Sequence, residues 1–310
     1  QVMRYLFLYL KGMLMGAADL VPGVSGGTLA LITGIYKEFL ESINNMSFDN
    51  LKFLRKQGIK VTWKKINGSF LLAVFGGIFS SILLFSRILE WLIKNEPLAL
   101  WSFFFGLLVA SIIYLFKSEL SLSVLNIFYL SVGALISFLV TQLNNGENYT
   151  SHWYLFLSGF IGISAMILPG LSGAYILVVM GVYNTILSNV RLAQDLVVNF
   201  DHAQFIKTAN ILGIFILGIL VGLKVFSKSL SWVLKRYPEK SIAVLVGLMV
   251  GALHKVWPWQ NNLIDSLKET RAVLPHQFIG NPQVDTVILW MSIGFGILFL
   301  VKRGKSLLIK

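Results

Sequence analysis

Residues 12–36 read GMLMGAADLVPGVSGGTLALITGIY, an apolar stretch interrupted near its centre by Pro22 and Gly23. Proline ends a helix and glycine permits a tight turn, so the pattern predicts a helix, a break and a second helix. Residues 159–183, GFIGISAMILPGLSGAYILVVMGVY, repeat this pattern around Pro169 and Gly170. We expect each stretch to form a re-entrant hairpin, which enters and leaves a membrane on the same side.

The composition shows which solvent surrounds the chain. Of the 310 residues, 56% are hydrophobic and only 13% are charged, and the mean hydropathy is +0.75. Because a soluble domain is about a quarter charged, a soluble fold is excluded. The apolar runs are continuous rather than alternating, which favours helices over a transmembrane β-barrel. The prediction is an all-α polytopic membrane protein.

Six further apolar runs are candidate transmembrane helices. The first three are each long enough to cross roughly 30 Å of hydrocarbon. The last three are shorter, and we expect flanking residues to extend them, because Lys and Arg side chains can reach the membrane interface. The six runs are residues 66–86, 97–116, 120–146, 208–223, 241–253 and 286–301.

The two halves of the chain repeat one another. Pro-Gly-x-Ser-Gly begins at Pro22 and again at Pro169, and Phe-Ser-Arg at 85–87 recurs as Phe-Ser-Lys at 226–228. Chance matches among apolar residues would not also align prolines and basic residues in the same order. Each repeat then holds one broken hairpin and three transmembrane helices. The repeats are residues 1–146 and residues 147–310.

Loop charges predict the orientation of the two repeats. Residues 49–65 carry six basic residues and one acidic residue, whereas their counterpart, 188–207, carries two of each. The next pair reverses this, since 86–97 is neutral and 224–240 has five basic residues and one acidic residue. Positive loops remain cytoplasmic. The pattern therefore predicts an inverted-topology repeat with cytoplasmic N- and C-termini, and such repeats work by alternating access around a central site.

The two breaks are the candidate site, because non-helical backbone at membrane depth must line a cavity or be buried in protein. Ser25 and Ser172 are expected to cap the helices that follow. Backbone amides behind each serine, with few side chains around them and a helix dipole behind them, are suited to bind an anion. The amides belong to Gly26, Gly27 and Thr28, and to Gly173, Ala174 and Tyr175.

Close helix packing is the alternative role for these glycines, since small residues commonly serve it in membranes. We expect that role at eight other positions. These are Gly12, Gly16, Gly76, Gly77, Gly106, Gly213, Gly218 and Gly247.

The stretch 15–36, MGAADLVPGVSGGTLALITGIY, and its weaker echo at 164–183, SAMILPGLSGAYILVVMGVY, resemble the DUF368 family of bacteria and archaea. Members of that family are described as polyprenyl-phosphate translocases. The resemblance implies a multi-pass protein of the prokaryotic plasma membrane. Its activity would be to flip undecaprenyl phosphate, the carrier lipid of peptidoglycan synthesis, from the outer to the cytoplasmic leaflet. By position, the family motifs cover Asp19, Pro22, Gly23, Ser25, Gly26, Gly27 and Thr28, then Pro169, Gly170, Ser172 and Gly173, with Ala174 and Tyr175 as departures in the second.

A phosphate held at mid-depth needs a cation, because burying an unpaired charge is costly. Arg87 and its repeat counterpart Lys228 are the first candidates, followed by Lys37 and Arg191. The alternative is that these long side chains only reach the membrane edge.

Asp19 is the only charged residue between Gly12 and Tyr36. An acid at that depth is a candidate for coupling transport to protons or another ion. The alternative is a structural role, in which its carboxylate accepts a backbone N–H at the helix break. Glu38 and Glu41 are expected to begin the solvated loop that follows.

Two other functions remain open. One is a secondary transporter of a small soluble anion. The other is a membrane undecaprenyl-pyrophosphate phosphatase, a class that also has inverted repeats but needs an arginine in a PGxSR-type loop and paired glutamates. Gly26 and Gly173 stand in the place of that arginine and Asp19 is a single acid, so we expect no enzyme.

Metal and cofactor chemistry are not expected either. The chain has no Cys, and its four His lack the spacing of metal ligands. The basic loops are interpreted as topology signals, so nucleic acid is not an expected partner. The expected partners are the polyprenyl-phosphate lipid and the bilayer itself, and the oligomeric state does not follow from the sequence.

Overall fold

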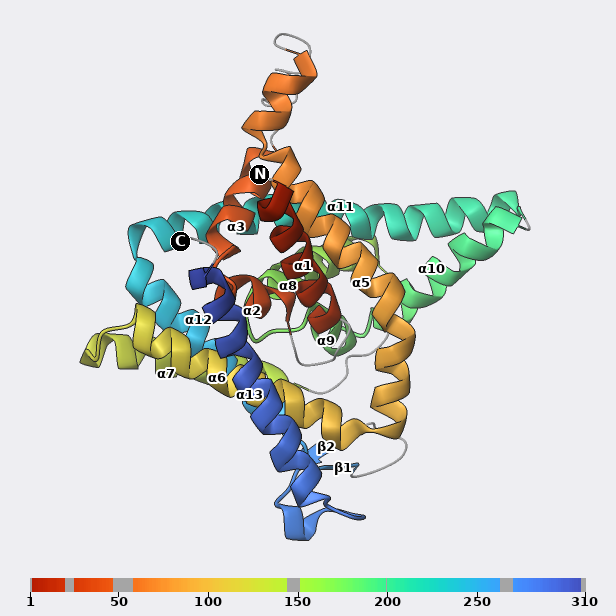
Figure 1. The fold of residues 1–310 in the computed structure, drawn as a ribbon. Helices are drawn as coiled ribbons and strands as arrows, with labels where there is room; N and C mark the ends of the chain where they lie inside the picture. Colours follow the sequence, from red (N-terminus) through yellow and green to blue (C-terminus); the bar gives the residue numbers. More distant parts are fainter. Residues whose placement is uncertain are drawn as a thin grey trace.

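A computed structural model describes residues 2–19, 25–46, 58–143, 151–198, 200–262 and 270–307 (Figure 1). The first half contains α1 (Val2–Asp19), α2 (Gly26–Ile32), α3 (Tyr36–Asn45), α5 (Gly68–Asn95), α6 (Pro97–Glu119) and α7 (Val124–Thr141). The second half contains α8 (His152–Ile167), α9 (Gly173–Val179), α10 (Tyr183–Val198), α11 (His202–Arg236), α12 (Pro238–Ala252) and α13 (Val284–Leu307). Between α12 and α13 lie the short helices η1 (Leu253–Lys255) and η2 (Pro275–Gln277) and the antiparallel strands β1 (Gln260–Asn262) and β2 (Thr270–Ala272).

The prediction of an all-α polytopic membrane protein is confirmed. Each of the six predicted runs falls on one helix, and α5, α6, α7 and α11 are long and apolar enough to cross a membrane. The pair α9 and α10, bent by 113°, would add a fifth span if counted as one. α12, with 15 residues, and the apolar part of α13, Val284–Phe299, are shorter.

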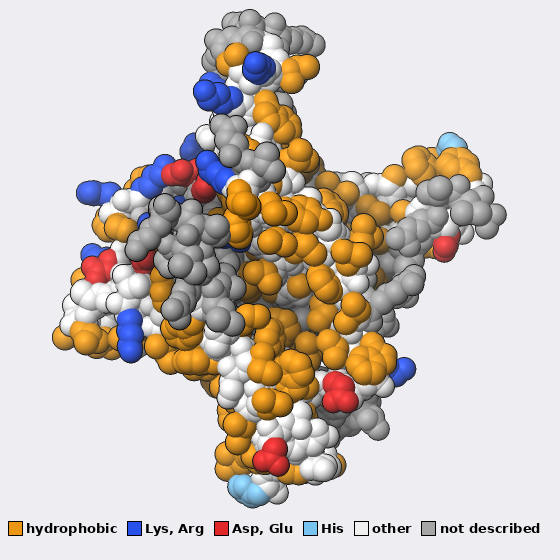
Figure 2. Space-filling view, viewed as in Figure 1, with side chains coloured by type: hydrophobic (Ala, Val, Ile, Leu, Met, Phe, Trp, Pro, Cys, Tyr) orange, Lys and Arg blue, Asp and Glu red, His pale blue; other side chains and the backbone are white. Residues whose placement is uncertain are grey.

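Large apolar side chains cover the outside of the helices. Leu83 on α5 is 78% exposed and Phe79 is 65% exposed, which water would not favour but hydrocarbon accepts. Figure 2 shows these side chains as a broad band across the middle of the molecule, with Lys and Arg gathered towards the end that carries the N-terminus. The described surface is therefore that of a protein surrounded by lipid.

Helix pairs in the two halves pack through matching glycines. A Cβ on Gly12 of α1 would lie 2.2 Å from the carbonyl oxygen of Val74 on α5. Its repeat counterpart, Gly159 of α8, lies in the same way against Phe215 of α11, at 2.3 Å. Only glycine permits such close backbone contact, so α1 packs on α5 as α8 packs on α11.

The remaining long helices exchange partners between the halves. Gly106 of α6 lies against the backbone of Met291 on α13, and Gly247 of α12 lies against that of Leu130 on α7. Each half therefore supplies one helix to a pair completed by the other half.

The expected packing role is confirmed for six of the eight glycines, whose Cβ would meet the backbone of another helix: Gly12, Gly16, Gly77, Gly106, Gly218 and Gly247. It is wrong for Gly213, whose Cβ position has no atom of another described helix within 4 Å. Gly76 meets only the ring of Tyr9, at 3.7 Å.

Candidate functional site

In the chain, the first Pro-Gly-x-Ser-Gly motif joins α1 to α2 and the second joins α8 to α9. α8 ends at Ile167 and α9 begins at Gly173, with Pro169 and Gly170 in the turn between them. Gly170 has φ +80°, and a Cβ there would lie 2.6 Å from Leu248 O on α12, so both the turn and its surroundings require glycine. In the first motif, Pro22 and Gly23 lie outside the described residues.

The two motif serines cap the helices that follow. Ser25 Oγ accepts a hydrogen bond from the Gly27 N–H at 3.1 Å, and Ser172 Oγ accepts one from the Tyr175 N–H at 3.4 Å. The capped helices, α2 and α9, have seven residues each. The serines therefore have the capping role that the motif predicts.

The first motif is bonded directly to the second. Ser25 Oγ lies 3.2 Å from the carbonyl oxygens of Met166 and Leu168, to which it can donate its one proton. The Gly170 N–H donates to Thr28 Oγ1 at 3.1 Å. Both Ser25 and Thr28 are 1% exposed. The start of α2 thus supplies partners for backbone groups that the end of α8 leaves unpaired.

Two further contacts strengthen this junction. Tyr36, which is 2% exposed, donates from its hydroxyl to Ile167 O at 3.1 Å. A Cβ on Gly27 would lie 2.4 Å from the same oxygen, so α2 approaches α8 as closely as its backbone allows. We call the contacts of Ser25, Gly27, Thr28 and Tyr36 with residues 166–170 the break junction.

In the conformation described, the amides of the first motif donate to groups of the chain itself. Asp19 Oδ1 accepts from the Gly26 N–H at 2.6 Å. The Gly27 N–H donates to Ser25 Oγ, and the Thr28 N–H donates to Ser25 O at 2.9 Å. The chain's own carboxylate occupies the position at which an external anion would accept. A Cβ on Gly26 would lie 2.4 Å from Asp19 Oδ2, so the glycine admits that carboxylate.

The second motif has fewer internal bonds. The Tyr175 N–H is bonded to Ser172, but among the described residues no hydrogen bond is recorded for the amides of Gly173 and Ala174. The two motifs are therefore unequal in the conformation described.

The predicted cations are not brought to the break junction by any contact in the described part of the chain. The side chains of Arg87 and Arg191 lie outside the described residues. Lys228 is exposed on α11. Lys37 lines a cavity of about 200 Å³ between α3 and α11, together with Glu41 and Lys235.

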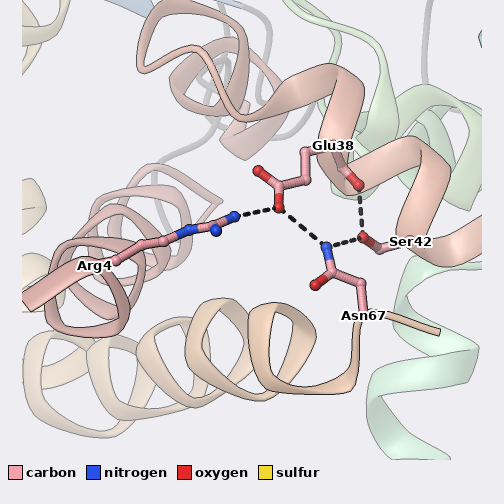
Figure 3. A network of polar contacts seen from close by, with 4 residues as sticks. All are labelled: Arg4, Glu38, Ser42 and Asn67. Atoms are coloured by element: carbon pink, nitrogen blue, oxygen red, sulfur yellow. Dashed lines mark hydrogen bonds and ion pairs between the residues drawn. The ribbon is translucent and has the colours of Figure 1, made fainter. Parts of the chain in front are cut away.

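Polar side chains join α3 to α1 and to the start of α5 (Figure 3). Arg4 Nη2 lies 2.9 Å from Glu38 Oε1, and Asn67 Nδ2 donates to the same oxygen at 3.0 Å and to Ser42 Oγ at 3.1 Å. Asn67 begins α5 in the left-handed region, with φ 55°. The expectation that Glu38 begins a solvated loop is wrong, because α3 continues to Asn45 and its side chains anchor it.

The opposite side of α3 is bonded to α11 in the second half. Asn44 Nδ2 donates to Ser227 O at 3.1 Å, and Ser227 Oγ donates to Asn44 Oδ1 at 2.9 Å. Lys224 Nζ donates to Asn44 O, and Lys235 lies 2.8 Å from Glu41. α10 follows α9 in the chain as α3 follows α2, and among the described side chains no hydrogen bond or ion pair joins α10 to α5.

One charged residue near the second motif was not predicted. The Lys255 ammonium lies 5.3 Å from the ring centroid of Tyr175, whose hydroxyl donates to Thr141 O or Leu143 O, both at 3.0 Å. No sequence pattern predicts a role for Lys255, because it stands two residues after the apolar run 241–253, where a lysine is common in an ordinary loop. In the described ranges, no group of three His, Asp or Glu could hold a metal ion.

These features define a class of protein: an all-α polytopic membrane protein in which the start of α2, after one Pro-Gly motif, is bonded to the turn of the other motif inside the fold. Residues 15–273 match the VCA0040-like family, described as undecaprenyl phosphate translocase-like, and the chain belongs to this family. The resemblance drawn from the motifs is thereby confirmed.

Two relatives cover most of the chain. The chain is 41% identical over 263 residues to a polyprenyl-phosphate transporter of Vibrio cholerae serotype O1, which is 85% of this chain and 81% of the relative. It is 30% identical over 261 residues to a polyprenyl-phosphate transporter of Staphylococcus aureus, covering 80% of this chain and 85% of that one. No solved structure matches the chain.

Proposed function

We propose that this protein is a transporter, not an enzyme, and that it carries undecaprenyl phosphate from the outer to the cytoplasmic leaflet of the prokaryotic plasma membrane. Its family and the names of both relatives support a polyprenyl-phosphate substrate. The membrane-length helices support a multi-pass location. The direction agrees with reuse of the carrier lipid, since the lipid phosphate is left in the outer leaflet and is needed again in the cytoplasmic one.

The observation that carries the proposal is the break junction. Ser25 and Thr28 of one half are bonded to residues 166–170 of the other, although more than 140 positions separate them in the sequence. Polar non-helical backbone from both halves is therefore buried at one place. A lipid phosphate crossing the hydrocarbon needs such a polar place near mid-depth.

The phosphate would be held by backbone amides at the two breaks. Gly173 and Ala174, behind Ser172, have amides with no recorded internal partner in the described residues. At the first break the phosphate would take the place of the Asp19 carboxylate at Gly26, because both are anions that accept the same N–H. Arg87 and Lys228 remain the proposed accompanying cations, and Asp19 remains the proposed coupling residue.

Alternating access would follow from an inverted repeat. Gly12 and Gly159 make equivalent contacts with the backbone of a neighbouring helix, as do Gly106 and Gly247, which supports corresponding packing in the two halves. α3 is bonded across to α11 at one end, whereas α10 has no such described bond to α5. This difference is what a carrier closed at one face and open at the other would have. Arg4, near the N-terminus, contacts Glu38 on α3, so α3 lies at the face that carries the N-terminus. With cytoplasmic termini, the closed face is therefore the cytoplasmic one.

A leaflet-exchange assay tests the proposal. Liposomes containing ³²P-labelled undecaprenyl phosphate in both leaflets are treated with a membrane-impermeant phosphatase. With the protein present, all the label should be released, whereas protein-free liposomes should keep the inner-leaflet share. Equal retention in both samples would contradict the proposal.

Two controls in the same liposomes separate the alternatives. Release of phosphate without added phosphatase would indicate an enzyme. Uptake of free ³²P-phosphate, without lipid exchange, would indicate a soluble-anion transporter.

A further inference from the structure

Two open apolar grooves flank His254, just beyond the end of α12. One, of about 560 Å³, lies between α7 and α12. The other, of about 440 Å³, is lined by Phe105 of α6, by Trp257 and by residues 272–274 near β2. Leu253 and His254 line both, so the grooves meet there, and Ala272 of β2 lines the second groove.

The first groove opens towards lipid. Its α7 wall includes Leu135, which is 58% exposed, and Phe138, which is 45% exposed. α7 is one of the helices long and apolar enough to cross a membrane. A groove on the outside of such a helix is filled by acyl or isoprenoid chains rather than by water.

A lysine, Lys255, is the next residue in the chain after His254, at which the grooves meet. Lys255 is half-buried and has no recorded ion pair among the described residues. Its ammonium is placed over the Tyr175 ring, and burial lowers the pKa of Lys255. An anion bound there would relieve the cost of that unpaired charge.

The surroundings of Lys255 are fixed. His254 Nδ1 lies 2.9 Å from Gly251 O and His254 Nε2 lies 3.0 Å from Thr141 Oγ1. Thr141 O also accepts from the Tyr175 hydroxyl. The ends of α7 and α12 and the start of α9 are thereby held together, and α9 begins at the second break.

We propose that Lys255 and the grooves beside His254 form a receiving site for a lipid that carries a terminal phosphate on a long apolar chain. The phosphate pairs with the Lys255 ammonium and the chain lies in the groove between α7 and α12. An amphiphile of this kind matches both features, whereas a soluble anion matches only the first. The site is separate from the break junction, rests on the proposed function, and leads to the second break through Tyr175.

Substitution of the lysine tests the headgroup contact. Lys255→Gln should weaken the binding of undecaprenyl phosphate to the protein in nanodiscs roughly 10- to 100-fold, the usual worth of a charged hydrogen bond, and leave that of undecaprenol unchanged. Lys240→Gln is the matched control, because Lys240 also lies over tyrosine rings, those of Tyr129 and Tyr237, but at the opposite end of α12. Lys255→Arg should retain binding.

Filling the groove tests the place of the chain. Ser131→Trp puts a large side chain into the groove, whereas Leu139→Trp puts one on the lipid-facing surface of α7 outside its described lining. We expect only the first to weaken binding of the long-chain lipid. Excess inorganic phosphate or phosphatidylglycerol should not displace it; displacement by either would assign the site to free phosphate or to bulk anionic lipid instead.

The outcomes distinguish the two proposals. Wild-type lipid exchange together with unchanged binding in Lys255→Gln and Ser131→Trp overturns the receiving site and leaves the proposed function intact. Lysine-dependent binding without any exchange by the wild-type protein overturns the proposed function instead.

Discussion

Gly27 offers the sharpest test of the break junction. Its Cβ position lies 2.4 Å from Ile167 O, and ordinary van der Waals contact begins at 3.4 Å. Gly27→Ala therefore requires α2 and the end of α8 to separate by about 1 Å. The separation would stretch the hydrogen bonds of Ser25 and Thr28 beyond bonding distance, because both already measure 3.1 to 3.2 Å.

The magnitude follows from those losses. Forcing a methyl group into a packed site costs about 1–3 kcal/mol, and two lost hydrogen bonds add about 0.5–1.5 kcal/mol each. The higher helix propensity of alanine returns about 1 kcal/mol. We expect the free energy of unfolding to fall by about 1–5 kcal/mol and lipid exchange to slow strongly.

Thermal unfolding in detergent and the leaflet-exchange assay measure the two effects. Gly213→Ala is the matched control, because among the described residues no atom of another helix lies within 4 Å of its Cβ position in the long helix α11. It should unfold and transport like the wild type or be slightly more stable. If Gly27→Ala also matched the wild type in both assays, the direct packing of the two breaks would be refuted.

Three further substitutions test separate contacts. Thr28→Val keeps the shape but removes the acceptor of the buried Gly170 N–H, so it should lower the unfolding free energy by about 1–3 kcal/mol, and an unchanged melting curve would contradict this. Asn44→Leu removes both bonds to the buried Ser227 and should favour separation of α3 from α11. Because the chain has no Cys, a cysteine pair introduced on these two helices measures their separation by the yield of disulfide cross-linking. An equal yield with and without Asn44→Leu would contradict the prediction. Asp19→Asn should slow exchange and abolish its response to an imposed pH gradient, and a retained response would remove the coupling role.

Hydropathy located the helices well because it reports how each segment meets lipid. The predicted run 97–116 corresponds to α6 at Pro97–Glu119, and 241–253 corresponds to α12 at Pro238–Ala252. The run 208–223 underestimated α11, which extends over His202–Arg236. The added turns carry Lys224, Lys228 and Lys235, which a search for charge-free stretches excludes although long side chains can reach polar surroundings.

The contacts of the break junction could not be predicted from the sequence. The motif identified Ser25 as a cap, and the structure agrees, because capping involves neighbours in the chain. Its second role, bonding to the end of α8, joins residues more than 140 positions apart, and no local pattern encodes that choice. The contact of Asp19 with the Gly26 N–H is different, because the two residues are close in the sequence, and it has the geometry of the structural alternative for that acid.

The backbone contact at Gly27 also constrains how the two halves can move. At Gly27 no side chain separates the backbone of α2 from Ile167 O, and Ser25 and Thr28 bond across the same contact, so in the proposed transport cycle the junction would act as a pivot. When one rigid body turns about a fixed point, the displacement of each atom grows with its distance from that point. In the proposed alternating access, a small rotation about this pivot would therefore become a larger displacement where α3 meets α11, and the ends of the protein would open while its centre stays packed.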